Sequence, residues 1–185
     1  KKLLKPYAVN DALMAKAADM PELDLFHPWA IDVGGAIELA RRCEEAAFAV
    51  SPKITNSEGA NISVQQSHFV SANSHGFIGG YATTHGLSCS VIAGEGDAMQ
   101  REYWYDSRRD AAELMSPEEV GRLAGERALA RLGAKKIRTC EVPVIFEAPL
   151  AVALIGNFVQ AVSGGALYRK ASFLLDSLGQ QVLAE

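Results

Sequence analysis

The chain has 185 residues, 49% of them hydrophobic, which is enough for one well-buried core, or for one domain and part of another. Its net charge of −4 argues against the broad basic surface that binds nucleic acid through many phosphates. Its 3 cysteines are odd in number and widely spread, with no Cys-x-x-Cys pair, so we expect reduced thiols in a cytoplasmic protein rather than a disulfide scaffold.

The first third of the chain predicts two helices and an ordered loop. Residues 9–18 have a helical apolar face and end before Pro21, and residues 24–29 form a loop that two aromatic side chains can hold to a core. Asp32 can cap an amphipathic helix that ends before Ser51-Pro52.

From Lys53 to Ile92 the hydrophobic period changes from helical to alternating, which predicts an antiparallel meander. Turns are expected at residues 57–60, 74–76 and 94–97. A further strand over residues 99–105 places Arg101, Tyr103 and Tyr105 on one face and Gln100, Glu102 and Trp104 on the other.

A helix is expected from Ser116, which caps it, to Gly133, a candidate left-handed residue. A strand over residues 139–146 and a helix over 148–161 then begin a new structural unit. The predicted class is therefore α+β: an antiparallel meander packed with amphipathic helices forms a domain over residues 1–135, and a second strand-helix domain starts over residues 136–185.

Residues 148–165 are the most hydrophobic run in the chain. The run is shorter than the roughly 20 apolar residues of a membrane helix, and Asn157 and Gln160 interrupt it, so a buried core helix is the better interpretation. Glu147 stands before this helix, where capping explains a carboxylate better than a general base does.

Signals for catalysis are few. No histidine is followed by glutamate, and no serine lies in a Gly-x-Ser-x-Gly elbow. His75 and His85 could approach each other across a hairpin and share a metal, although turn or strand histidines bound to backbone explain them better. The glycine-rich segments lack the spacing of a phosphate-binding loop.

Tyr168, Arg169 and Lys170 are the candidate contact residues. They place a phenol and two cations just after Gly164-Gly165, where they could receive a peptide carboxylate or an acidic partner surface. A solvated turn is the alternative interpretation.

Four segments together resemble the TldD/PmbA family: residues 23–29, 69–77, 143–149 and, most specifically, 161–179. The resemblance runs from about residue 20 to the end of the chain and implies a central portion of a cytoplasmic bacterial protein. It also implies pairing with TldD in a heteromeric zinc metallopeptidase that cleaves unfolded peptides, including the precursor of the peptide antibiotic microcin. The resemblance also implies a link to DNA gyrase.

In this family TldD carries a His-Glu-x-x-x-His zinc motif on the helix that residues 150–160 resemble, and this stretch has no histidine. The resemblance therefore implies the non-catalytic member of the pair, with no catalytic residue and no zinc ligand in this chain, and with zinc in the TldD partner. The expected partners are a TldD-like subunit and unfolded peptides, without direct contact to nucleic acid or membrane.

Two alternatives remain open, so the assignment as an enzyme stays open too. The protein could be a metallopeptidase in its own right, with ligands outside this segment or from His75 and His85. It could also be a regulatory protein that acts on DNA gyrase.

Overall fold

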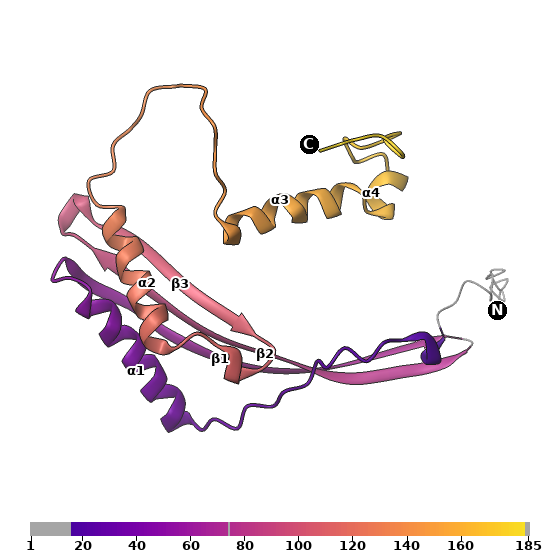
Figure 1. The fold of residues 1–185 in the computed structure, drawn as a ribbon, viewed down its shortest axis with the longest axis horizontal. Helices are drawn as coiled ribbons and strands as arrows, with labels where there is room; N and C mark the ends of the chain where they lie inside the picture. Colours follow the sequence, from indigo (N-terminus) through magenta and orange to yellow (C-terminus); the bar gives the residue numbers. More distant parts are fainter. Residues whose placement is uncertain (1–15, 74, 184–185) are drawn as a thin grey trace, which may run out of the picture. The chain divides into compact units, whose positions relative to one another are not determined.

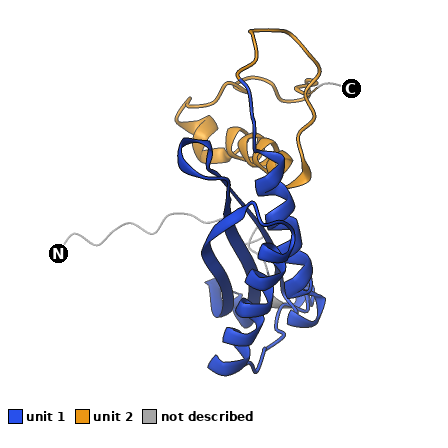
Figure 2. Ribbon diagram, turned by 90° about the vertical axis from the view of Figure 1, so that its left-hand side faces the viewer, with its two compact units in different colours: residues 1–135 blue, residues 136–185 orange. Residues whose placement is uncertain are grey.

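The structure, a computed structural model, describes residues 16–73 and 75–183 (Figure 1). It divides into two compact units, Lys1–Lys135 and Lys136–Glu185, shown in blue and orange in Figure 2. The helix expected over residues 9–18 falls mostly outside the described residues, whose first element is the short 3-10 helix η2 (Ala17–Asp19).

The first unit is built on an antiparallel sheet with the strand order β1-β2-β3. The strands are β1 (Ile54–Asn73), β2 (Gly76–Ala93) and β3 (Gln100–Arg108). Asn73 pairs with Gly76 across the first turn, and η3 (Gly96–Ala98) lies in the second. The α+β class and both of these turns are confirmed.

The turn expected at residues 57–60 is wrong, because β1 runs through this stretch as one long strand. The register with β2 shifts between Ser57 and Gly59, and Gly59 takes a φ of 106°. The Ser57 hydroxyl accepts a hydrogen bond of 2.8 Å from the Gly59 amide. Glycine at positive φ therefore absorbs the extra residue as a β-bulge instead of reversing the chain.

Two helices, α1 (Val33–Ala49) and α2 (Pro117–Ala130), cover one face of the sheet (Figure 1). Asp32 is the N-cap of α1 and accepts a 2.7 Å hydrogen bond from the Gly35 amide. Ser116 caps α2 in the same way, and Gly133 has the expected positive φ of 72°. These local predictions are confirmed because each depends on a residue type suited to its position.

Replacing Asp32 by alanine should lower the free energy of unfolding of the first unit by about 1 kcal/mol, because an amide in the first turn of α1 loses its acceptor. Urea unfolding followed by the fluorescence of Trp29 and Trp104 measures the loss. Asp32→Asn keeps an acceptor oxygen and should lose less than half as much. Equal losses in the two variants would contradict the capping role.

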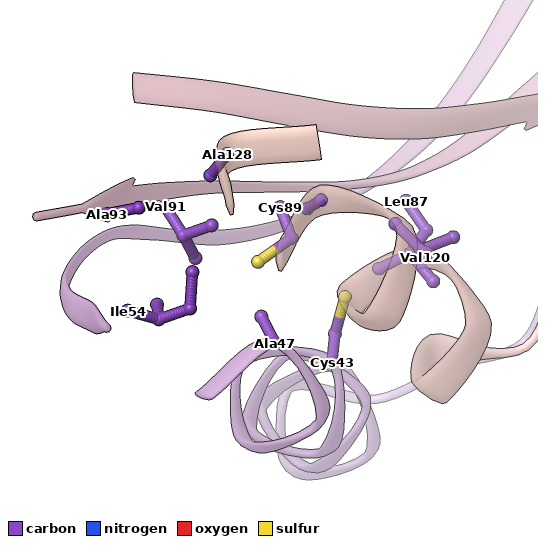
Figure 3. Packing of buried hydrophobic residues seen from close by; sticks show 10 residues of the cluster. Cys43, Ala47, Ile54, Leu87, Cys89, Val91, Ala93, Val120 and Ala128 are labelled. Carbon is purple, nitrogen blue, oxygen red and sulfur yellow. The ribbon is translucent and has the colours of Figure 1, made fainter. Parts of the chain in front are cut away.

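The core lies between the helices and the sheet, where every second residue of β2 from Thr83 to Ala93 is buried (Figure 3). Trp104 of β3 packs against this core beneath the guanidinium of Arg127, which lies 4.8 Å from its ring centroid. Tyr103 and Tyr105 stack on the opposite, exposed face, so the predicted alternation of β3 is confirmed. The buried core residues are Cys43, Ala47, Ile54, Leu87, Cys89, Val91, Ala93, Val120, Ala124 and Ala128.

Cys43 on α1 and Cys89 on β2 lie next to each other in this core (Figure 3). A hydrogen bond with the Cys89 thiol and then burial raise the pKa of the Cys43 thiol far above its ordinary value. The thiolate form of Cys43 is therefore disfavoured, which makes this thiol a poor nucleophile. Cys140 is exposed.

The two helices approach each other through a glycine notch on α2. A Cβ atom on Gly121 would lie 1.9 Å from the backbone oxygen of Cys43, and one on Gly125 would lie 2.8 Å from that of Ala47. Gly121 and Gly125 are four residues apart on α2, and Cys43 and Ala47 are four residues apart on α1, so each pair lies on one face of its helix. The two helices therefore meet backbone to backbone along these faces.

The second unit contains α3 (Ala148–Ala161) and α4 (Gly164–Tyr168). The strand expected over residues 139–146 is wrong: these residues are exposed and make no ladder with any described segment. Burial of the helix is wrong as well, since Ala161 is its only buried residue. Both predictions needed packing neighbours that the described part of this unit lacks. No helix in residues 16–73 and 75–183 is long and apolar enough to cross a membrane.

Candidate functional site

The chain reverses sharply after α4, at two of the predicted contact residues. Arg169 is the C-cap, and Lys170 follows with a φ of 55°, a left-handed conformation that is costly for a lysine. The Lys170 amide bonds to the oxygen of Leu167 at 3.0 Å, and the next amide, of Ala171, bonds to that of Ala166 at 2.9 Å. This pair of bonds is a Schellman motif, in which glycine usually holds the position of Lys170.

The reversal brings the following residues back onto the end of α3. The Ser172 hydroxyl donates a 2.7 Å hydrogen bond to the oxygen of Ala161. An open hollow of about 320 Å³ lies between the two segments. Its lining includes one cationic side chain and no acidic one. The lining residues are Asn157, Gln160, Ala161, Ala166, Arg169, Ala171, Ser172 and Phe173.

Only one of the three predicted contact residues lines the hollow. Arg169 lines the hollow, whereas Tyr168 and Lys170 are exposed outside its lining, and 89% of the Tyr168 side chain is accessible. Sequence reasoning missed Asn157 and Gln160 as parts of the same site, although their spacing of three residues on an apolar helix is a usable signal. The arrangement suits an anionic or amide-bearing ligand, because one cationic and two amide side chains line the hollow.

A zinc ion does not fit the residues of α3. A catalytic zinc site needs three ligands drawn from His, Cys, Asp and Glu side chains, and α3 contains none of these residue types. Across residues 16–73 and 75–183 no group of three or more such side chains is close enough to hold a metal ion.

The expected approach of His75 and His85 across a hairpin is wrong. His75 lies in the turn between β1 and β2, whereas His85 lies on β2 opposite Val64, nine positions beyond Gly76. At about 3.3 Å per residue the two are about 30 Å apart along the strand, so they cannot share a metal. The long uninterrupted hairpin, which the sequence did not predict, causes the separation.

His85 instead holds the segment before α1 to the sheet. It is fully buried, its Nε2 lies 2.8 Å from the backbone oxygen of His27, and its ring meets Trp29 edge to face. The buried Thr83 hydroxyl accepts a 2.9 Å hydrogen bond from the His27 amide and donates one of 2.9 Å to the Arg109 oxygen. These contacts hold the segment before α1 against β2 and explain the ordered loop expected over residues 24–29. The role of His85 and Thr83 is therefore structural.

Two family descriptions match the chain in sequence order. The PmbA/TldA metallopeptidase central domain matches residues 26–132, and the PmbA/TldA metallopeptidase C-terminal domain matches residues 139–185. The first match contains the whole sheet and both of its helices. The second contains α3, α4 and the hollow.

Curated relatives agree with these matches. The chain is 45% identical over 170 residues to the metalloprotease PmbA of Escherichia coli O157:H7, and 44% identical to a PmbA homologue of Haemophilus influenzae. Each alignment covers 91% of this chain and 38% of the relative. The chain therefore spans well under half the length of these relatives.

Two solved structures share the fold, and both are described as putative modulators of DNA gyrase. The one from Bacteroides thetaiotaomicron has a TM-score of 0.80 at 26% identity, and the alignment covers 89% of this chain and 38% of the other. The one from Thermotoga maritima has a TM-score of 0.78 at 21% identity, with 87% and 38% covered. With both domains matched in order and this identity to curated relatives, the chain belongs to the PmbA/TldD metallopeptidase family.

Proposed function

We propose that this chain is part of the partner subunit of a TldD-type heteromeric zinc metallopeptidase. The complex acts in the cytoplasm on unfolded peptides, including microcin-type antibiotic precursors. The TldD-like subunit supplies the zinc ion and its ligands, and this chain contributes to the surface that receives the peptide.

The observation that carries the proposal is the composition of α3. The helix that the family resemblance aligns with the zinc-binding helix of TldD offers only Asn157 and Gln160 as polar side chains. The other side chains of α3 are apolar, so the helix offers no ligand to a metal ion. This composition suits a subunit that keeps the fold and leaves the metal to its partner.

The hollow beside Arg169 supports contact with a peptide. A guanidinium forms paired, charge-assisted hydrogen bonds with a carboxylate, and amide side chains pair with peptide groups. Arg169, Asn157 and Gln160 provide both kinds of group around one open space.

Co-expression of the full-length protein with the TldD-like subunit tests the proposal. We expect the two proteins to elute as one complex, zinc to follow the TldD-like subunit, and peptide cleavage to require both. Stoichiometric zinc and peptide cleavage in the isolated protein would sink the proposal and leave a peptidase in its own right.

Arg169→Ala should lower kcat/KM of the complex for an unfolded peptide about tenfold, mainly through KM, because one charge-assisted contact is lost. Arg138→Ala removes an exposed cation of the same unit outside the hollow and should leave kcat/KM within about twofold of the wild type. Equal losses in both variants would show a general effect of charge and contradict the contact.

Regulation of DNA gyrase is the second candidate, and it is supported by the descriptions of the two structural relatives. The acidic net charge of the chain favours gyrase itself over DNA as the direct contact. A pull-down with the full-length protein that retains gyrase and not the TldD-like subunit would favour this function over the peptidase role.

A further inference from the structure

The guanidinium of Arg169 lies against its own helix, where it lines the hollow. A Cβ atom on Gly165, one helical turn earlier, would lie 3.3 Å from Arg169 Nη1 and 3.6 Å from Arg169 Nη2. A branched side chain at position 165 would therefore displace the guanidinium. Gly164 differs, since a Cβ atom there would meet nothing within 4 Å. Of the two adjacent glycines, Gly165 is the one that makes room for Arg169.

This guanidinium has no counter-ion within the part of the chain that the structure describes. It makes no hydrogen bond and no ion pair there, and no acidic side chain lines the hollow. Arg41, Arg42 and Arg122, on the helices of the first unit, each bind a glutamate instead. Arg169 therefore keeps its guanidinium donors available for a ligand.

An amide oxygen in the same hollow is available as an acceptor. Asn157 Nδ2 donates a 2.9 Å hydrogen bond to the backbone oxygen of Ala153, one turn earlier on α3. This bond fixes the orientation of the amide and leaves Asn157 Oδ1 free to accept from a ligand. The Ser172 hydroxyl is already engaged, since it donates to the Ala161 oxygen and accepts from the Leu174 amide at 3.0 Å. The hollow thus offers a cationic donor and an oriented neutral acceptor.

The rest of the lining is mostly small and apolar, which leaves room for one residue of a ligand. Its volume of about 320 Å³ is at the lower end of ligand pockets, which range from roughly 300 to 1,000 Å³. Phe173 adds an apolar ring that is 83% exposed. The small apolar residues are Ala161, Ala166 and Ala171.

We propose that the hollow binds the free carboxyl terminus of a peptide. A terminal residue carries a carboxylate and an N–H group on the same Cα, so it requires a cationic donor and a neutral acceptor close together. Arg169 holds the carboxylate through paired, charge-assisted hydrogen bonds, and Asn157 Oδ1 accepts from the N–H group. The inference rests on the proposed function, because it names the part of the unfolded peptide that this subunit receives.

A carboxylate in a peptide can also come from an aspartate or glutamate side chain. Such a side chain holds its carboxylate on a flexible stem, so its distance from the backbone N–H varies. Only the terminal residue presents both groups at a fixed separation. The hollow should therefore favour the chain end over an internal acidic residue, and over an internal segment, which has no charge to pair with Arg169.

Binding of fluorescent peptides to the full-length protein tests the proposal without cleavage and without the TldD-like subunit. Three unstructured peptides carry a dye at the amino terminus and share one alanine- and glycine-rich sequence. The first ends in a free carboxylate, the second in a carboxamide, and the third in a glutamate whose α-carboxyl group is amidated. Fluorescence anisotropy measures each Kd, and we expect the first peptide to bind about tenfold more tightly than the other two.

Arg169→Ala should remove this preference and bring the three Kd values within about twofold of one another. Gly165→Val should raise the Kd of the free-carboxylate peptide about fivefold, because its side chain takes the place of the guanidinium. Gly164→Val is the matched control, since it makes the same replacement where the added Cβ atom meets nothing, and it should leave all three Kd values unchanged. Thermal unfolding checks that each variant is folded.

Equal Kd values for the free-carboxylate and carboxamide peptides, or no binding of either, overturn the proposal. Equally tight binding of the glutamate peptide would show that the hollow accepts any carboxylate, and the assignment to the chain end would be wrong. A preference that survives in Arg169→Ala would place the carboxylate elsewhere and overturn it as well. Failure of the proposed function is separate, because it appears as the absence of a complex with the TldD-like subunit or as zinc-dependent cleavage by the isolated protein.

Discussion

Replacing Gly121 by alanine is expected to destabilise the first unit by about 3 kcal/mol or more. The added Cβ would lie 1.9 Å from the backbone oxygen of Cys43 and 2.9 Å from its carbonyl carbon. Neither atom is the end of a flexible side chain, so the added methyl group can fit only if α1 and α2 move apart. That movement opens gaps around the buried residues that the helices share with β2.

Urea unfolding followed by the fluorescence of Trp29 and Trp104 measures the effect of Gly121→Ala. Gly34→Ala is the control, because its Cβ would meet only the Asp32 carboxylate at an ordinary 3.6 Å. Alanine should stabilise α1 there by about 0.5 to 1 kcal/mol through helix propensity. Similar unfolding midpoints for the two variants would refute the close approach of the helices.

Replacing Thr83 by valine should cost about 2 to 3 kcal/mol although valine has nearly the same shape. The Thr83 side chain is 1% exposed, and its hydroxyl joins the His27 amide to the Arg109 oxygen. Valine would leave the His27 amide without its acceptor and the Arg109 oxygen without its donor. The segment that precedes α1 should then detach from β2 more easily than the sheet unfolds.

Thr83→Ser separates the hydroxyl from the methyl group and should cost about 1 kcal/mol, because both hydrogen bonds remain and only a methyl is lost. Thr84→Val makes the valine replacement at the neighbouring exposed position and should change little. Hydrogen exchange at the amide of His27 reports the local detachment. If serine cost as much as valine at position 83, the hydroxyl could not be the source of the stability.

Local features were predictable from the sequence where a residue type is suited to one position only. Asp32, Ser116 and Gly133 mark helix ends, and alternation along β3 separates Trp104 from the two tyrosines. These predictions depend on the physics of one turn or one strand, which a short window of sequence contains. The confirmed α+β class follows from their order.

Predictions that depend on distant neighbours failed. The bulge at Gly59 looked like a turn, because glycine at positive φ serves both and only the pairing with β2 distinguishes them. Residues 139–146 looked like a strand but have no pairing partner among the described residues. In the site, Arg169 was found by its charge, whereas Asn157 and Gln160 joined it only through the chain reversal at Lys170.

The three cysteine thiols can be used to measure how often the core of the first unit opens transiently. Cys140 is exposed and should react with a thiol reagent at once, whereas Cys43 and Cys89 are at most 1% exposed and must wait until the helices leave the sheet. The lag between the fast and slow labelling phases therefore gives the frequency of that opening, with Cys140 as an internal reference for the reagent. Because the two buried sulfurs lie side by side, both should become reactive in the same event.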